Sequence, residues 1–522
     1  MTYKFYLYGP PGCGKTSVGQ ALAESLNLPL FDLDSEIERR AGETIPAVFA
    51  SHGEEHFRLL ERESLAAFMG VEKGVVALGG GALLNDESRA RVISNGTVIC
   101  LKASLETLMR RMQAEEGQRP LLNGGLETQL VELISQRADH YTSFPMQVET
   151  DGLQPGEIAW RIQVRLGAFH VKGMGAGYDV RVRADGLDSL GEYLRRNGLR
   201  DGVALVCDEN LAQLYSSQAV AALERVGYTT HMVTIPPGEV HKTVETVTAL
   251  WDAFVDAGLE RGGTVAALGG GVTGDLAGFA AATYLRGVPW AVLPTTLLAM
   301  VDASLGGKTG IDLRRGKNLA GAFHPPRLVL ADTNTLTSLP ERELRSGMAE
   351  VVKAGLIGDP ALFERCAQGW EAVCASLDEV VRRAMAVKVQ VIQADPYENS
   401  YRAALNLGHT LGHAFEMASD YRLLHGEAVA IGLAGETRLA ESLGLAERGL
   451  ADKVEETLIR LGLPARLPQE LDRVTIWRAM QVDKKRVRGS LRFALPARIG
   501  EVRVGIEAPD NRVIDQVLDQ LS

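Results

Sequence analysis

The chain has few cysteines, no long apolar run and no excess of positive charge, and each absence excludes a class of protein. Its cysteines are odd in number, and no two have the C-x-x-C spacing: Cys13, Cys100, Cys207, Cys366 and Cys374. This favours a reduced, cytoplasmic protein over a disulfide framework. No apolar run reaches the roughly 18 residues that a membrane-spanning helix needs, so no membrane partner is expected. The net charge of −11 argues against nucleic-acid partners.

The 522 residues predict about three domains. Residues 1–165 alternate β-rich runs with amphipathic helices, beginning with the strand KFYLYG, which is unlike a signal peptide. A Gly-rich stretch over 166–177 is predicted to be a linker, and a second α/β run follows over 178–342. Helical patterns dominate 343–522, with a mixed tail after Leu463. The expected fold class is therefore α/β: a parallel-sheet domain, then a Rossmann-like domain, then a mostly helical domain packed on it.

The five letters ALGGG occur twice, at Ala77–Gly81 and at Ala267–Gly271, 190 residues apart (267 − 77). The flanking sequences do not align, so we do not interpret the pair as an internal repeat. In each case a buried strand ends in glycines, which let a backbone turn sharply or approach a ligand. The two stretches therefore predict two separate sites.

The first site begins with GPPGCGKT at Gly9–Thr16, which matches G-x-x-x-x-G-K-[ST] between a predicted strand and a predicted helix. This context indicates a P-loop nucleotide-binding domain. Lys15 would reach the outer phosphates of ATP, and the Thr16 hydroxyl would bind Mg²⁺. Backbone amides would bind phosphate at the turn: Gly12, Cys13 and Gly14.

Residues that follow the P-loop suit a small anionic acceptor. Asp32 and Asp34 are predicted on one face of the strand LFDLD, one for Mg²⁺ and one for substrate hydroxyls. Arg58, Arg137 and Arg119, the last in a Gly-flanked segment that is typical of a mobile lid, could bind a carboxylate and the migrating phosphoryl group. Taken singly, each arginine is more often a solvated surface residue.

The order P-loop, DxD, FRxxE, GGG and RPLL resembles shikimate kinase over residues 1–165. The resemblance implies Mg²⁺ bound with ATP by Thr16 and Asp32, and a lid residue Arg119 that touches ATP beside Lys15. It implies a shikimate site made of Asp34, Arg58, Gly79, Gly80, Gly81 and Arg137. The segment that contacts adenine stays unassigned.

The second site begins at GGGVTGD, where a strand, three glycines and a helix indicate a dinucleotide pyrophosphate, although the G-x-G-x-x-G spacing is missing. Asp208 lies at a predicted strand end, where it could bind ribose, and Glu239 and Lys242 lie in a loop. Lysines in an irregular, Gly-rich segment suit a phosphorylated or carboxylated substrate; this segment contains Asp302, Lys308, Lys317 and Asn318.

The clearest sign of a catalytic site in the sequence is a group of three histidines. His409 and His413 are four residues apart on one predicted helix face, and His425 follows 12 residues later. Glu350 lies in an otherwise apolar helical stretch, where a carboxylate needs a cation or hydrogen bonds. A catalytic zinc site uses three protein ligands and an open position. A single histidine pair more often lies on the polar face of a helix or is hydrogen-bonded within the core. The concentration of polar residues over 402–425 nevertheless favours a catalytic site.

The motifs GGGVTGD, VDASLGGKTG, GKNLAGAF, GMAEVVK, LNLGHTLGHAFE, HGEAVA and DKK are similar to those of 3-dehydroquinate synthase over about Tyr178 to Pro496. The resemblance implies Zn²⁺ or Co²⁺ bound by Glu350, His409 and His425, and His413 as an acid/base group linked with Glu398. One departure is His241, where the family more often has an aromatic residue such as Tyr.

The resemblance also implies a nucleotide site and a substrate site. NAD would be bound by Asp208, Glu239, Lys242, Gly270, Gly271, Val272, Asp275, Thr295, Thr296 and Lys317. The heptulosonate phosphate would be bound by Arg286, Asp302, Lys308, Asn318, Lys353, Lys388, Arg402, Asn406 and Lys484. Lys308 would also be catalytic, and Arg286 would reach the substrate across a homodimer formed by the synthase part.

We therefore interpret the chain as a fusion of two enzymes of the shikimate pathway, which makes aromatic compounds. One would phosphorylate shikimate with ATP. The other would convert 3-deoxy-D-arabino-heptulosonate 7-phosphate to 3-dehydroquinate, with NAD reduced and then regenerated. The alternatives are another sugar-phosphate cyclase or a polyol dehydrogenase, fused to a P-loop module that only senses nucleotide.

Overall fold

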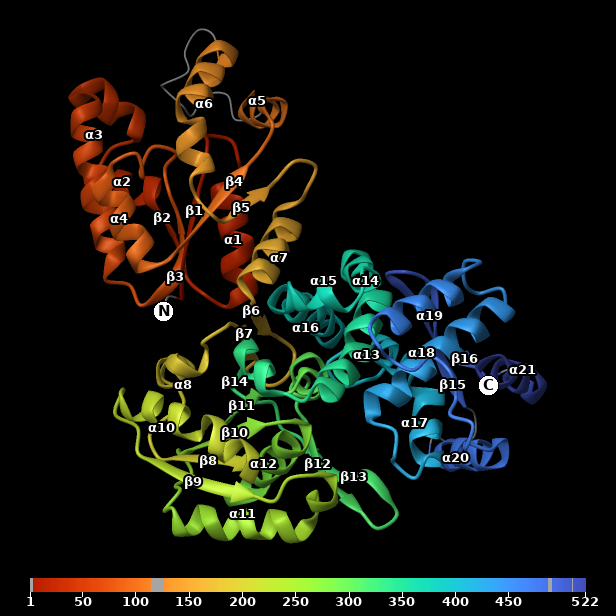
Figure 1. Cartoon of the computed structure of the whole chain (residues 1–522). Coiled ribbons are helices and arrows are strands. Elements are labelled where there is room, and N and C mark those ends of the chain that lie inside the picture. Colours follow the sequence, from red (N-terminus) through yellow and green to blue (C-terminus); the bar gives the residue numbers. More distant parts are fainter. Residues whose placement is uncertain (1–2, 114–125, 487–490, 509) are drawn as a thin grey trace. The chain divides into compact units, whose positions relative to one another are not determined.

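The computed structural model describes residues 3–113, 126–486, 491–508 and 510–522, and of residues 126, 129 and 481–486 it describes the backbone alone. The chain divides into two compact units, Met1–Ala168 and Phe169–Ser522, which are described separately (Figure 1). No helix in these ranges is both long enough and apolar enough to span a bilayer.

The first unit is a five-stranded parallel sheet with helices on both faces, in the order β2-β3-β1-β4-β5. The strands are β1 (Tyr3–Tyr8), β2 (Leu30–Asp32), β3 (Lys73–Ala77), β4 (Thr97–Lys102) and β5 (Gln147–Glu149). The helices are α1 (Lys15–Leu26), α2 (Leu33–Ala41), α3 (Ile45–Met69), α4 (Asp86–Asn95), α5 (Leu105–Gln113), α6 (Leu126–Thr142) and α7 (Pro155–Leu166).

The central strand β1 is buried on both sides because helices cover both faces of the sheet. Phe5 and Leu7 point into a core that includes residues of α1 and α7. Tyr6 and Tyr8 point into the opposite core, which includes residues of α2, α3 and α4. The C-terminal ends of β1 and β3, which carry the P-loop and the first ALGGG, are neighbours because these strands pair in parallel.

The second unit contains a seven-stranded sheet in the order β6-β7-β14-β11-β10-β8-β9, with parallel pairing from β7 to β9. Its strands are β6 (Ala168–Val171), β7 (Tyr178–Val182), β8 (Val203–Asp208), β9 (Thr230–Ile235), β10 (Thr264–Gly269), β11 (Trp290–Pro294) and β14 (Leu328–Ala331). Its helices are α8 (Leu190–Arg196), α9 (Glu209–Leu211), α10 (Ser217–Glu224), α11 (Val244–Asp256) and α12 (Gly271–Thr283), with short turns η2 (Leu187–Ser189), η3 (Ala212–Ser216), η4 (Glu239–His241), η5 (Tyr284–Arg286), η6 (Ala299–Ala303) and η7 (Thr333–Ser338).

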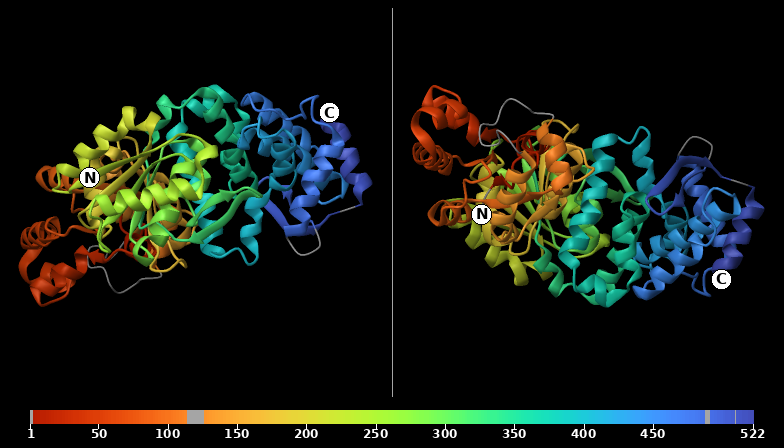
Figure 2. Two further views of the ribbon diagram at one scale, coloured as in Figure 1. Left: turned by 90° about the horizontal axis from the view of Figure 1, so that it is seen from below. Right: turned by 90° about the horizontal axis from the view of Figure 1, so that it is seen from above.

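The rest of this unit is mostly helical and lies beside the sheet in both views of Figure 2. It consists of α13 (Glu341–Gly358), α14 (Pro360–Ala367), α15 (Trp370–Cys374), α16 (Leu377–Ala394), η8 (Tyr401–Asn406), α17 (His409–Ala418), α18 (His425–Ser442), α19 (Leu450–Arg460), α20 (Arg473–Arg486) and α21 (Asn511–Leu521). A strand pair, β15 (Arg492–Arg498) and β16 (Glu501–Glu507), lies before α21. The expected fold class is confirmed.

Three local expectations differ from the structure. Asp34 is not on a strand: β2 ends at Asp32, whose carboxylate caps α2, so Asp34 lies in the first helical turn. The Gly-rich segment is not irregular but forms the hairpin β12 (Lys308–Leu313) and β13 (Gly316–Phe323), because its glycines let the two backbones approach closely. Part of the expected linker forms β6, whose four residues are all buried.

Candidate functional sites

The P-loop joins β1 to α1 and presents backbone amides at a helix N-terminus. Gly12 and Gly14 have φ angles of 77° and 91°, a left-handed conformation that favours glycine. The Lys15 ammonium folds back over the loop and donates to the carbonyl oxygens of Gly9 at 3.1 Å and Pro10 at 3.0 Å. Backbone amides at a helix N-terminus, the helix dipole and a lysine together form an anion site.

A hydroxyl and a carboxylate meet beside this loop. The Thr16 Oγ1 donates to the Asp32 Oδ2 at 2.9 Å. The other carboxylate oxygen of Asp32 accepts from the Ser35 amide at 3.2 Å, which holds the side chain at the end of β2. Hard oxygen ligands of this kind suit Mg²⁺ bound together with a nucleotide phosphate.

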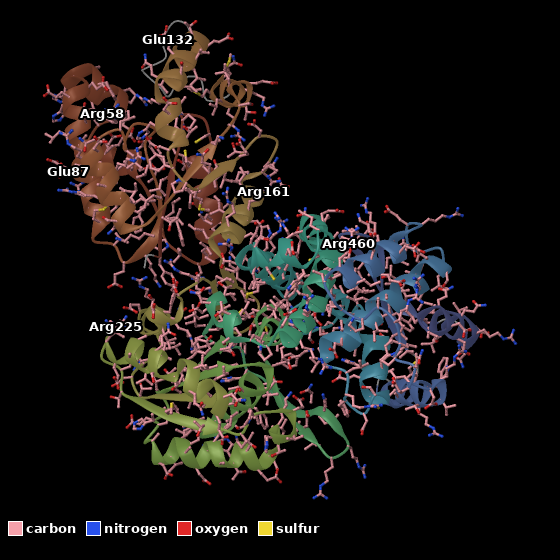
Figure 3. All side chains as sticks on the ribbon, viewed as in Figure 1. Arg58, Glu87, Glu132, Arg161, Arg225 and Arg460 are labelled. Carbon is pink, nitrogen blue, oxygen red and sulfur yellow. The ribbon has the colours of Figure 1, made fainter. Side chains whose placement is uncertain are left out.

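The first ALGGG lies among the residues that are expected to bind shikimate, the acceptor of the phosphoryl group. A Cβ atom at Gly79 would lie 3.2 Å from the Asp34 Oδ1, and one at Gly81 would lie 2.8 Å from the Arg58 guanidinium. The Arg137 Nη1 donates to the Gly80 carbonyl at 3.4 Å. Arg58, labelled in Figure 3, lies on α3. The glycines therefore keep open the space between an acidic and two basic side chains, while Arg119 lies outside the described residues.

Two residues of this region were missed in the sequence. Glu61 is buried and accepts from Arg58 at 2.8 Å, and burial raises the pKa of its carboxyl above the usual range against the opposing effect of Arg58. Its signal was the i, i+3 spacing within FRLLE. Arg111 donates to the Cys13 carbonyl at 3.4 Å and to the Thr150 carbonyl at 3.0 Å, which joins α5 and the end of β5 to the P-loop. No spacing in the sequence marked Arg111.

In the second unit, three helices bring one carboxylate and two imidazoles together. The Oε1 of Glu350 on α13 lies 3.4 Å from the His409 Nε2 and 3.7 Å from the His425 Nε2. One ligand atom from each residue lies within 4.8 Å of the others. The Glu350 Oε1 is buried and accepts no hydrogen bond from the described residues. An unsatisfied buried carboxylate oxygen facing two ring nitrogens fits a cation better than an apolar core.

The other ring nitrogens have partners of their own. The His409 Nδ1 lies 3.1 Å from the Leu407 carbonyl, and the His425 Nδ1 lies 3.2 Å from the Glu416 Oε2. Both partners are acceptors, so each Nδ1 carries a proton, and the Nε2 on the side of Glu350 is the atom left to bind a metal. This is the arrangement in which a histidine binds a metal. Sequence reasoning missed Glu416, although it lies within the motif GHAFE.

Lysines surround the carboxylates of this site. Lys353 forms an ion pair with the Glu350 Oε2, and its ammonium lies 3.9 Å from the Asp302 Oδ1. The Lys388 ammonium lies 2.5 Å from the same Asp302 oxygen. Burial raises the pKa of Glu350, but the Lys353 ammonium outweighs this effect and the net value falls to about 2. Burial lowers the pKa of Lys388 below its usual value. The structure therefore joins four of the expected residues in one charged network.

Other expected residues lie around this network. The His413 ring meets the His409 ring edge-on, with centroids 5.1 Å apart. Glu398, expected beside His413, forms an ion pair with Lys308. Arg402 is buried and donates to the Pro396 carbonyl. Two further residues of the expected substrate site, Asn406 and Arg286, are exposed, and the Lys484 side chain lies outside the described residues.

The expected nucleotide residues gather at the C-terminal ends of β8, β10 and β11. The strand order reverses between β8 and β10, which is where open α/β sheets bind ligands. The Asp208 carboxylate at the end of β8 accepts from two α9 amides at 3.0 Å. A narrow hollow lies at the start of α12, and its lining includes Gly270, Gly271, Asp275 and Lys308. Val272 follows in the first turn of α12, and Thr295 and Thr296 follow β11.

Ion pairs link this nucleotide region to the hairpin β12–β13 and to Glu416, which contacts the cluster of Glu350, His409 and His425 through His425. The Lys242 ammonium lies 2.6 Å from the Asp275 Oδ2 and donates to the Asn318 Oδ1 at 2.6 Å. The Lys317 ammonium lies 2.9 Å from the Glu416 Oε1 and 3.9 Å from the Glu239 Oε1. These bonds join several of the expected nucleotide residues to Asn318 of the expected substrate site and to Glu416, the partner of His425.

Comparison with known families identifies both units. A family model described as shikimate kinase matches residues 11–166. Models described as 3-dehydroquinate synthase N-terminal and 3-dehydroquinate synthase C-terminal match residues 232–346 and 347–486. A 3-dehydroquinate synthase of Synechococcus sp. is 43% identical over 354 residues, which cover 66% of this chain and 96% of the relative.

Two solved structures resemble the second unit. One is ValA, a 2-epi-5-epi-valiolone synthase of Streptomyces hygroscopicus subsp. jinggangensis with NAD⁺ and Zn²⁺ bound; it is 32% identical, with a TM-score of 0.60, over 66% of this chain and 96% of that one. The other is a 2-deoxy-scyllo-inosose synthase with carbaglucose-6-phosphate, NAD⁺ and Co²⁺; it is 27% identical, with a TM-score of 0.63, over 68% of this chain and 100% of that one. The chain therefore belongs to the 3-dehydroquinate synthase family and carries a shikimate kinase domain ahead of it, so it is a fusion of two shikimate-pathway enzymes.

Proposed function

We propose that the second unit converts 3-deoxy-D-arabino-heptulosonate 7-phosphate to 3-dehydroquinate with loss of phosphate, using NAD and a divalent metal. The observation that carries this proposal is the unsatisfied Glu350 Oε1, which faces the Nε2 atoms of His409 and His425. These three residues would hold Zn²⁺ or Co²⁺. When bound, the metal would supply a Lewis acid for a substrate hydroxyl, and NAD would supply reversible hydride transfer at the carbon that bears it.

The residues around this cluster have binding and proton-transfer roles in the proposal. Lys353 and Lys388 place positive charge beside the carbon that is oxidised, and Asp302 keeps both ammonium groups in place. Lys308, Arg402, Asn318 and Asn406 would orient the substrate carboxylate and phosphate. His413, packed on the His409 ring, would transfer a proton. The Lys308–Glu398 ion pair would rearrange when the substrate binds.

The nucleotide would lie across the reversal of strand order. The amides of Gly270, Gly271 and Val272 at the start of α12 would bind its pyrophosphate, and Asp208 would bind ribose. Lys242, Asp275, Glu239 and Lys317 would line the same region together with Thr295 and Thr296. The Thr295 Oγ1 supports this proposal because it is buried without a hydrogen-bond partner among the described residues.

We propose that the first unit phosphorylates shikimate to shikimate 3-phosphate with ATP and Mg²⁺. Lys15 and the amides of Gly12, Cys13 and Gly14 would bind the phosphates, and Thr16 and Asp32 would hold the ion. Asp34 would accept from the reacting hydroxyl, while Arg58 and Arg137 would bind the carboxylate. Arg119 would complete the phosphate site from the lid.

One experiment tests both activities in the full chain. Phosphate release from the heptulosonate phosphate is measured with trace NAD⁺, before and after a zinc-selective chelator, while NADH absorbance is followed. We expect chelator-sensitive release with no NADH accumulation, and shikimate-dependent ADP formation that the chelator does not affect. NADH that rises with a polyol substrate would overturn the synthase assignment.

A second candidate for the C-terminal unit is another sugar-phosphate cyclase. The resemblance in fold to the valiolone and deoxyinosose synthases favours it, since the second of these is bound to a sugar-phosphate analogue, carbaglucose-6-phosphate. Their identities of 32% and 27% are lower than the 43% to the 3-dehydroquinate synthase. Turnover of another sugar phosphate, such as glucose 6-phosphate, in place of the heptulosonate phosphate would establish this alternative.

We also propose a homodimer through the second unit, in which Arg286 binds the substrate phosphate of the partner subunit. Arg286 supports this because it is exposed, and so available to a partner subunit, and because it has a left-handed φ of 66°. Sedimentation should give a dimer, and mixing Arg286→Ala chains with Glu350→Gln chains should restore part of the synthase activity, because each mixed dimer has one site with both Arg286 and Glu350. A monomer with full activity would contradict the proposal.

A further inference from the structure

Three hydrogen-bond donors converge on a single carbonyl oxygen in the kinase unit, that of Gly80. The Tyr141 hydroxyl donates to it at 2.8 Å, the Tyr8 hydroxyl at 3.2 Å and the Arg137 Nη1 at 3.4 Å. A carbonyl oxygen has two lone pairs, so three donors are more than it needs to be satisfied. Both tyrosines are buried. Neither of them belongs to the P-loop, the acidic pair or the arginines.

Gly80 lies where the two halves of the kinase site meet. A Cβ atom at Gly80 would lie 3.3 Å from the Gly9 carbonyl oxygen and 3.4 Å from the Pro11 ring, both in the P-loop. A Cβ atom at Gly79 would lie 3.2 Å from the Asp34 Oδ1, and one at Gly81 would lie 2.8 Å from the Arg58 guanidinium, so these glycines adjoin the proposed shikimate-binding residues. The Gly80–Gly81 peptide would therefore separate the phosphate from the shikimate when both are bound.

Three consecutive glycines cannot hold such a peptide by themselves, because glycine has the greatest backbone freedom. The peptide is planar, so donors that fix the Gly80 oxygen also fix the direction of the Gly81 N–H. Tyr8 ends β1 and directly precedes the P-loop, and Tyr141 lies on α6. The two hydroxyls thus attach the acceptor loop to the elements that carry the phosphate loop and Arg137.

The Tyr8 hydroxyl has a second hydrogen-bond partner, the neighbouring His140. Its Nε2 lies 3.1 Å from the Tyr8 oxygen. The Tyr8 hydroxyl has one proton, and it can donate that proton to Gly80 only if His140 donates to Tyr8. The arrangement therefore forms a chain from His140 through Tyr8 to Gly80.

We propose that Tyr8 and Tyr141 are positioning residues for phosphoryl transfer, which hold the Gly80 peptide and so set the spacing between ATP and the acceptor hydroxyl. This inference rests on the proposed kinase function. Phosphoryl transfer depends mainly on alignment, and a displacement of about 1 Å can cost roughly 100-fold in rate. Loss of the hydroxyls should therefore lower kcat rather than weaken nucleotide binding.

The test compares Tyr8→Phe, Tyr141→Phe and the double variant with a control on the same strand, Tyr6→Phe. Tyr6 is equally buried, and its hydroxyl bonds the Asn95 Oδ1 at 2.7 Å, so its loss costs a buried hydrogen bond without touching Gly80. Synthase turnover of the same full chain gives the concentration of intact protein, and thermal unfolding reports the stability of each variant.

We expect shikimate-dependent kcat to fall roughly 10- to 100-fold in the double variant, with smaller losses in the single ones and the KM for ATP within about twofold of wild type. The Tyr6→Phe chain should keep its kcat. A double variant that loses no more kcat than Tyr6→Phe, or that loses only affinity for ATP, would overturn the inference. A wild-type chain without shikimate-dependent ADP formation would instead overturn the proposed function, and this inference with it.

Discussion

The Nδ1 of His425 lies 3.2 Å from the Oε2 of Glu416, and the Nε2 of the same ring faces Glu350 at 3.7 Å. Glu416 therefore orients a proposed metal ligand from behind and fixes its tautomer. Burial raises the pKa of Glu416, but its bonds to His425 and Lys317 lower the net value to about 2, so it stays ionised at neutral pH. The hydrogen bond then joins an imidazole to a full negative charge.

The first prediction follows from this pair. Glu416→Gln should weaken metal binding by roughly 10- to 100-fold, because the amide provides a weaker acceptor for the imidazole N–H. The measurement is competition for Zn²⁺ or Co²⁺ against a chelator of known affinity, with no substrate present. Glu364→Gln is the control, since Glu364 forms only an exposed ion pair with Lys453. Equal affinities for the two variants would contradict the orienting role.

A second prediction separates the two activities. Lys15→Met should lower shikimate phosphorylation by roughly 10²- to 10³-fold, because it removes the charge that is proposed to bind the transferred phosphate. The same chain should keep its synthase turnover. Glu350→Gln should do the reverse, with loss of phosphate release and intact ADP formation. Loss of both activities in either variant would show that the two sites depend on one another.

The third prediction concerns pH and Glu436. This buried glutamate on α18 accepts from the Gly408 amide at 2.6 Å and the Leu411 amide at 3.0 Å, and so caps α17. Burial raises the pKa of its carboxyl to about 8, against the lowering effect of the amides. Because the folded-state pKa is raised, the stabilisation is complete below the unfolded value of about 4.3 and is lost as the pH rises through 8.

The Glu436→Gln variant cannot ionise and should lack this loss. Thermal unfolding at pH 5 and at pH 8.5 should therefore show a larger decrease in Tm for wild type than for Glu436→Gln. The exposed Glu364→Gln chain should follow wild type. Parallel Tm profiles for wild type and Glu436→Gln would refute the raised pKa.

The fourth prediction concerns the close packing of α17 on α18. A Cβ atom at Gly432 would overlap the Gly408 carbonyl oxygen and lie 2.9 Å from the Gly412 nitrogen. Both contacts are backbone atoms that cannot rotate away, so Gly432→Ala should destabilise the second unit by about 1–3 kcal/mol. It should also weaken metal binding, because His409 and His425 are the first residues of these two helices.

Gly262→Ala is the matched control, since its Cβ atom would meet no atom within 4 Å. Chemical denaturation of both variants gives the comparison. A Gly432→Ala chain as stable as Gly262→Ala would contradict the close approach of the helices.

Sequence patterns were most informative where the chemistry is local. The P-loop was predicted with its strand, its glycines and its helix, because these elements follow one another within a few residues of the chain. His409 and His413 share a face of α17, as their spacing indicated. The expectation for Asp34 failed for a local reason too: the Asp32 side chain bonds the Ser35 amide, which starts α2 two residues earlier than the alternating pattern suggested.

The composition and motifs of this chain thus determined the fold class, the two families and the residue types at each site, since these depend on short-range spacing and on backbone freedom at glycine. Only the tertiary structure decided which groups act together. Glu416 meets Lys317, and Tyr8 meets Gly80, across 99 and 72 residues of chain. Such contacts arise when hydrophobic burial packs distant helices and strands together. A buried polar group must then find its partner wherever the fold places it.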